Sequence, residues 1–170
     1  MLKNIRHFSF AFFLFIAFVK CDGDETKRIN DSKISSTFQG KVIAIKDGDS
    51  FKVLLHDSEK SIRLAHIDCP EKGQPYGNNA KQFASMLCFG KTVTVQNEGK
   101  TDVYGRIIGE VILQDGTNVN KELIKNGLAW HYKKYSTDES YSKLEASARE
   151  QKIGLWSEDQ NPIAPWEWRK

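Results

Sequence analysis

The strongest constraint on the fold is the order of the hydrophobic patterns along the chain. Alternating apolar and polar residues, the pattern of half-buried strands, occur in residues 42–55, 60–67, 91–96 and 106–113. Helical spacing occurs once between these segments, at residues 80–87, and twice after them. A parallel α/β sheet would instead alternate strands with helices. The order therefore predicts an α+β domain, a small antiparallel β-barrel of about five strands with packed helices.

Turn and cap residues predict where these elements end. An Asp-Gly-Asp turn at residues 47–49 joins the first two strands as a hairpin, and two prolines and two glycines hold residues 70–77 open as a loop. A second Asp-Gly turn leads into a short strand at residues 117–119. Asn120 is expected to cap the second helix, and the third helix is expected over residues 138–152.

The net charge of the chain comes from its first 21 residues. The 170-residue sequence has 25 Lys+Arg and 22 Asp+Glu, a formal net charge of +3, and three basic residues precede the first acidic residue, Asp22. They flank an apolar run at residues 8–19, shorter than the roughly 20 residues that a membrane span needs. This order indicates a secretory leader at residues 1–21 and export to the extracellular space or periplasm. The alternative is a lipoprotein anchored through Cys21.

The remainder of the chain is long enough for one domain and carries no net charge. We expect a flexible polar lead-in at residues 22–36, a folded domain at residues 37–157, and a tail at residues 158–170 that docks on the domain. In an extended tail, Trp166 and Trp168 would lie on one side. The sequence predicts a monomer without a membrane span.

The two cysteines of the folded domain allow two interpretations. Cys69 and Cys88 could form a disulfide in an oxidising compartment. Alternatively, Cys88, which lies in an apolar run, is a small buried hydrophobic residue.

Acidic residues gather at two loops. Asp47 and Asp49 share a face of the first hairpin, and Asp68 and Glu71 lie in the second loop, shortly after Arg63. Carboxylates brought together from separate segments repel one another, and a hard divalent cation bound through oxygens is the usual compensation. The simpler interpretation is that the aspartates only form turns.

An arginine also follows a turn. Arg106 comes directly after Gly105, at the start of a predicted strand. A guanidinium can hold two phosphate oxygens at once, which lysine cannot. Alone, an arginine beside a turn more often forms a surface salt bridge, so its assignment depends on the other motifs.

Taken together, these motifs resemble the staphylococcal nuclease family in order and spacing over residues 38–156. They comprise residues 47–50, 63–71, 76–77, 102–106, 119–123, 127–129 and 154–156. The resemblance implies an OB-fold, a five-stranded antiparallel barrel with three packed helices. It also implies a calcium-dependent phosphodiesterase that hydrolyses DNA and RNA to 3′-phosphorylated products.

The resemblance implies a role for the acidic residues. Asp49 and Asp68 would be carboxylate ligands of one Ca²⁺, with the backbone carbonyl of Cys69 as a further ligand. Glu71 would be the general base or the carboxylate that orients the attacking water. Arg63 and Asp68 are five residues apart and would point to opposite faces of a regular strand, so we predict a bulge or strand end between them.

The resemblance also implies a role for basic and aromatic residues. Arg63 and Arg106 would hold the scissile phosphate, and Tyr104 would lie near the terminal phosphate of a nucleotide. Tyr132 and Tyr135 could stack on a base. The rival interpretation is a non-catalytic OB-type module that binds single-stranded nucleic acid by stacking and backbone charge. The presence of all five candidate calcium-binding and catalytic side chains favours the enzyme.

Overall fold

The computed structural model describes residues 36–157 and 161–170. The expected leader, Cys21 and all of the expected lead-in except Ser36 lie outside the described residues. Within the two described ranges, no helix is long and apolar enough to cross a membrane.

The described chain combines strands and helices in the order expected of an α+β domain. The elements are β1 (Thr37–Asp47), β2 (Ser50–Leu55), β3 (Ser58–Leu64), β4 (Ile67–Asp68), α1 (Gly77–Cys88), β5 (Thr92–Thr101), β6 (Ile107–Ile112), α2 (Val119–Lys125), β7 (Trp130–His131), α3 (Glu139–Glu150), a 3₁₀ helix (Gly154–Trp156) and α4 (Pro165–Trp168).

Five of the strands form the predicted barrel. They follow the order β1-β2-β3-β6-β5, and the barrel is closed because β1 pairs with β5 as well as with β2. The barrel is antiparallel in every pairing but one, since β3 and β6 are parallel, with Ile62 opposite Ile107. Strand direction cannot alternate around a closed ring with an odd number of members. One parallel pair is therefore unavoidable here.

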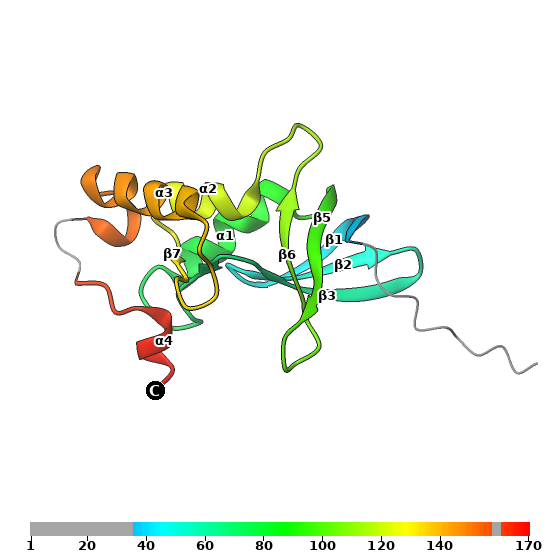
Figure 1. Cartoon of the computed structure of the whole chain (residues 1–170), viewed down its shortest axis with the longest axis horizontal. Coiled ribbons are helices and arrows are strands. Elements are labelled where there is room, and N and C mark those ends of the chain that lie inside the picture. The colour runs from blue at the N-terminus through cyan, green and yellow to red at the C-terminus, as the bar shows by residue number, and fades with distance from the viewer. Residues whose placement is uncertain (1–35, 158–160) are drawn as a thin grey trace, which may run out of the picture. The chain divides into compact units, whose positions relative to one another are not determined.

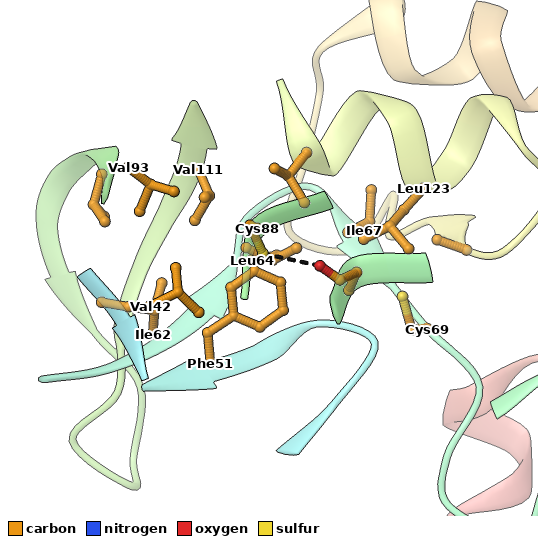
Figure 2. Packing of buried hydrophobic residues seen from close by; sticks show 14 of the residues in the cluster. Val42, Phe51, Ile62, Leu64, Ile67, Cys69, Cys88, Val93, Val111 and Leu123 are labelled. Carbon is orange, nitrogen blue, oxygen red and sulfur yellow. Dashed lines mark hydrogen bonds between the residues drawn. The ribbon is translucent and has the colours of Figure 1, made fainter. Parts of the chain in front are cut away.

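The barrel interior is filled by large aliphatic and aromatic side chains. Phe51, Ile62 and Leu64 are fully buried, and Val42 and Val111 are buried with them (Figure 2). Alternate residues of β6 point inward, as the period-2 pattern predicts. Each such side chain contributes about 1.5–3 kcal/mol when it is fully buried.

Helices α1, α2 and α3 gather at one end of the barrel (Figure 1). Helix α1 buries Ala80, Ala84 and Cys88, which are four residues apart and so share one face. The predicted cap of α2 was wrong by two residues: the side chain of Asn118 accepts a hydrogen bond from the Lys121 N–H at 3.1 Å. The short strand predicted at residues 117–119 is only a single bridge, between Ile112 and Asn118.

Asn120 instead fastens α2 to the barrel. Its buried side chain accepts a hydrogen bond from the Val111 N–H at 3.0 Å and donates to the carbonyls of Ala65 at 3.0 Å and Gly109 at 3.3 Å. Three backbone groups that the barrel leaves near its end are thus satisfied by one side chain.

The end of the tail is helical and not extended. Pro165 occupies the first turn of α4, where its missing N–H costs nothing. In a helix, residues two apart point to nearly opposite sides. Trp166 is therefore half-buried, whereas Trp168 is 45% exposed, and the two rings do not share a side.

The disulfide interpretation of the cysteines was wrong: Cys69 and Cys88 are both free and buried. Figure 2 shows them well apart, with the Cys88 Sγ donating a hydrogen bond to the Ala84 carbonyl at 3.0 Å. Cys69 packs against the first hairpin, because a Cβ added at Gly48 would lie 2.9 Å from its Sγ. Cys88 is thus the small buried hydrophobic residue of the alternative interpretation.

Neither Cys69 nor Cys88 of the native protein should react with a disulfide reagent such as DTNB at pH 8. Burial raises the pKa of Cys88 to about 12 and that of Cys69 well above its ordinary value. Only the thiolate is a nucleophile, so both groups are protonated as well as inaccessible. The absorbance of released thionitrobenzoate should correspond to both thiols after unfolding in guanidinium without reductant. An unfolded protein that yields no thiol at Cys69 and Cys88 would restore the disulfide.

Candidate active site

The end of β3 brings Arg63 and Asp68 to the same side of the chain. Strand β3 stops at Leu64, His66 adopts a left-handed φ of 69°, and β4 begins at Ile67. The predicted strand end is therefore confirmed. It allows the Arg63 Nη2 to reach the Asp68 Oδ1 at 2.7 Å.

Arg63 is the centre of a buried cluster. Its Nη1 lies 3.1 Å from the Asp49 Oδ2, and the same nitrogen donates to the carbonyls of Leu64 at 2.9 Å and Ile67 at 3.0 Å. Burial lowers the pKa of this guanidinium, but the Asp49 and Asp68 carboxylates outweigh that effect and raise it. Arg63 is therefore a permanent positive charge, fixed in direction by two backbone carbonyls.

Asp49 is a buried carboxylate with a raised pKa. Burial raises its pKa to about 7; Arg63 opposes this shift, whereas Asp47 and Asp68 add to it. The Cys69 N–H donates to the Asp49 Oδ2 at 2.7 Å, so the peptide group of Cys69 lies beside the two aspartates. Arg63 therefore only partly offsets the effect of burial on this carboxylate.

The donor set of this cluster fits a hard cation. Asp49 and Asp68 offer buried carboxylate oxygens, and Ca²⁺ takes six to eight oxygen ligands from carboxylates, backbone carbonyls and water. Among the described residues, no group of three or more His, Cys, Asp or Glu side chains forms a metal site. A bound calcium would therefore need backbone carbonyls and water beside the two aspartates.

The parallel pairing of β3 with β6 places Arg106 next to the same cluster. Its Nη1 donates to the Ser50 Oγ at 2.9 Å, and the Ser50 Oγ lies 3.3 Å from the Asp49 Oδ1. The Arg106 Nε is held by the Asp102 Oδ2 at 2.6 Å. Slight burial raises the pKa of Asp102, but hydrogen bonds from the Arg106 and Tyr104 backbones and the Arg106 side chain lower it overall. Sequence analysis gave no role to Asp102 or Ser50, which position this second guanidinium.

Glu71 lies in the loop between β4 and α1, at the edge of the cluster. Its N–H donates to the Gln74 Oε1 at 2.9 Å, and its carbonyl accepts from the Gln74 N–H at 3.0 Å. The loop passes close to the start of α1, because a Cβ at Gly77 would lie 2.2 Å from the Glu71 carbonyl oxygen. The site thus contains two guanidiniums, two buried carboxylates and a third carboxylate at its rim.

This cluster of arginines and carboxylates lies in a domain that is similar to known proteins. The model of the family described as "Staphylococcal nuclease homologue" matches residues 61–158. The chain belongs to the staphylococcal nuclease family. It is 44% identical over 138 residues to a protein of Escherichia coli named "Uncharacterized endonuclease", covering 80% of this chain and 88% of that protein. It is 40% identical to the "Micrococcal nuclease" of Shigella flexneri, over 78% of this chain and 81% of that protein.

The tyrosines of this staphylococcal nuclease domain lie in different environments. Tyr104 is 81% exposed, and its ring centroid lies 5.5 Å from the Arg106 guanidinium carbon. Tyr135 is exposed and packs edge-on against Tyr132, whose ring is stacked on Trp166. Tyr104 therefore lies beside Arg106, and Tyr132 lies against the C-terminal tail.

A hollow of about 530 Å³ opens beside Tyr132 in the nuclease domain. Aromatic and basic side chains line it together: Trp130, Tyr132, Trp166, Lys133, Lys134, Arg149 and Lys170, with His131 and Glu145. Stacking surfaces interleaved with positive charge are typical of proteins that bind single-stranded nucleic acid.

Sequence analysis also missed Arg169, which contacts the carboxylates of the site. Its Nη2 lies 2.7 Å from the Asp68 Oδ2, and its Nη1 contacts the Glu71 Oε1. Arg169 lies beyond the segment that matches the family model. The only signal in the sequence was a basic end after two tryptophans.

Proposed function

We propose that the protein is a calcium-dependent nuclease that hydrolyses DNA and RNA to 3′-phosphorylated products and acts after export from the cytoplasm. The observation that carries the proposal is the convergence of Arg63 and Arg106 on Asp49, one by direct contact and one through Ser50. The basic and apolar order of residues 1–21 supports export.

The two arginines suit a phosphodiester substrate. Attack on phosphorus adds negative charge to the phosphoryl oxygens, and fixed positive groups aimed at those oxygens stabilise the transition state. Arg63 is fixed by backbone carbonyls and Arg106 by Asp102, so neither guanidinium has to reorganise during the reaction. Each retains further N–H donors for a phosphate oxygen.

Asp49, Asp68 and the backbone carbonyl of Cys69 would hold the calcium ion. When bound, the ion would place positive charge near the phosphoryl oxygens, where negative charge develops in the transition state. It would also favour the ionised form of Asp49, whose pKa is raised mainly by burial and further by the neighbouring Asp47 and Asp68 carboxylates.

Glu71 is suited to accept the proton of the attacking water. Its carboxylate lies at the rim of the cluster and is about one-third exposed, so water can approach it. Proton transfer to a positioned carboxylate contributes roughly 10² to 10⁴-fold to a rate.

The proposed contacts account for cleavage of both DNA and RNA. Arg63 and Arg106 would hold phosphate oxygens, which are the same in both polymers, and phosphate contacts carry no sequence information. Tyr132, Tyr135 and the hollow beside them would accept a base by stacking, which every base allows.

Digestion of plasmid DNA and single-stranded RNA tests the proposal. Both should be degraded in calcium and remain intact in a calcium chelator, because the ion is proposed to supply positive charge at the scissile phosphate. The fragments should become polymerase primers only after phosphatase treatment, which reports 3′-phosphate ends. Equal cleavage with and without calcium would contradict the proposed cofactor. Binding of both polymers without cleavage would establish the non-catalytic module.

A further inference from the structure

Residues 161–170, here called the C-terminal arm, lie against the proposed active site. The Gln74 Nε2 donates to the Ile163 carbonyl at 2.6 Å, and the Trp166 ring stacks on Tyr132 with centroids 5.3 Å apart and planes 2° from parallel. The Gln74 Oε1 also accepts a hydrogen bond from the Glu71 N–H, so Gln74 links the arm to the loop that carries Glu71. The arm is therefore anchored on two parts of the site.

Arg169 occupies the carboxylates of the site. It approaches both oxygens of Asp68, with its Nη2 2.7 Å from Oδ2 and its Nη1 3.3 Å from Oδ1, and it also pairs with Glu71. Arg63 already lies 2.7 Å from the same Oδ1. The hydrogen bond to Asp68 is the main reason that the pKa of Arg169 is raised, and the guanidinium of an arginine is charged at any ordinary pH.

This arrangement is incompatible with a cation bound to Asp68. Calcium binds carboxylate oxygens at about 2.3–2.6 Å, close to the distance at which Arg169 already lies. Two positive groups cannot share that position. Glu71 also accepts a hydrogen bond from Arg169, and Trp166 covers a face of Tyr132 on which a base would stack.

We propose that the C-terminal arm is a tethered inhibitor of the nuclease, in which Arg169 competes with calcium for Asp68 and Glu71. Trp166 competes with a nucleotide base for Tyr132 in the same closed state. The inference rests on the proposed function, since it assigns calcium to Asp68. The arm then sets the calcium concentration at which the site becomes competent.

The contacts of the arm are suited to reversible release. Helix α4 has four residues, and the Arg169 side chain is 40% exposed, so its ion pairs are partly screened by solvent. When only the open state binds a ligand, the apparent affinity is the intrinsic affinity multiplied by the fraction of molecules that are open. An open fraction near one in ten therefore raises the half-saturating calcium concentration about tenfold. The arm also lies outside residues 61–158, the segment matched by the family model.

Calcium titration by calorimetry, without nucleic acid, tests this competition in the full chain. Arg169→Ala should bind calcium with a dissociation constant about tenfold lower than that of the unmodified protein. Lys170→Ala is the matched control: it removes the same charge one residue further on, but Lys170 pairs with Glu167 within the arm. Its calcium affinity should equal that of the unmodified protein.

A second variant and a second readout extend the test. Trp166→Ala removes the stacking on Tyr132 and should also tighten calcium binding, by about threefold, because the arm opens more often. In cleavage assays, Arg169→Ala should lower the half-saturating calcium concentration while the rate at saturating calcium stays unchanged.

The outcomes separate this inference from the proposed function. Equal calcium affinity of the unmodified protein and Arg169→Ala would overturn the inhibitory arm and leave the calcium site in place. Weaker binding by Arg169→Ala would overturn it too, since Arg169 would then support the site. Failure of every variant to bind calcium would overturn both proposals.

Discussion

Replacing Glu71 with glutamine should lower kcat by about 10² to 10⁴-fold at saturating calcium. Glutamine has the same shape as glutamate but cannot accept a proton from water. KM should change little, because the contacts proposed for the substrate phosphate belong to Arg63 and Arg106. The measurement is the initial rate of single-stranded DNA hydrolysis over a range of substrate concentrations. Saturating calcium is needed because the substitution also weakens the contact with Arg169.

The control for this experiment is Glu59→Gln. Glu59 lies on β3 and forms an ion pair with Lys52 on the neighbouring strand β2, at the surface of the barrel. Glu59→Gln removes the same charge as Glu71→Gln and should leave kcat and KM unchanged. If Glu71→Gln lost less than about threefold in kcat, well below the usual contribution of a general base, Glu71 would not be the proton acceptor.

Replacing Asn120 with alanine should lower the free energy of unfolding by about 3 kcal/mol. The change leaves the Val111 N–H and the Ala65 carbonyl without their buried partner, and each such group costs about 1–3 kcal/mol. Gly109 loses less, because its carbonyl also accepts from the Ala65 N–H at 2.8 Å. Urea unfolding followed by circular dichroism measures the change.

Asn118→Ala is the matched control for stability. Asn118 caps the same helix, and loss of such a cap costs about 1 kcal/mol. If both variants lost the same stability, Asn120 would act only as a helix residue and not as the link between α2 and the barrel.

Local patterns predicted most of the fold. The period-2 segments became β1, β2, β3, β5 and β6, and the helical segments became α1, α2 and α3, because each is long enough for one buried face to repeat. Strands β4 and β7 have two residues each, too few for any period. Asparagine is a good helix cap, so the residue type favours Asn118 and Asn120 equally. Only the hydrogen bonds of Asn120 to the barrel show that it is not the cap.

The candidate site was predictable where its residues belong to short motifs. The short motifs place five residues in turns, in loops or at strand ends: Asp49, Arg63, Asp68, Glu71 and Arg106. Side chains at such positions can meet where neighbouring loops come together. The contact of Arg169 with Asp68 joins residues 101 positions apart. Neither a hydrophobic period nor a turn residue encodes such a pair, since its geometry depends on the path of the whole chain.

The parallel pairing of β3 with β6 also determines when the site first exists. During synthesis, Ile62 must wait for Ile107 to emerge before the barrel can close, and pairings between distant residues form slowly. Until then, the hairpin that carries Asp49 has no Arg106 beside it. A chain that ends before Arg106 should therefore lack the pair of arginines proposed for catalysis, and the site is complete only in the finished domain.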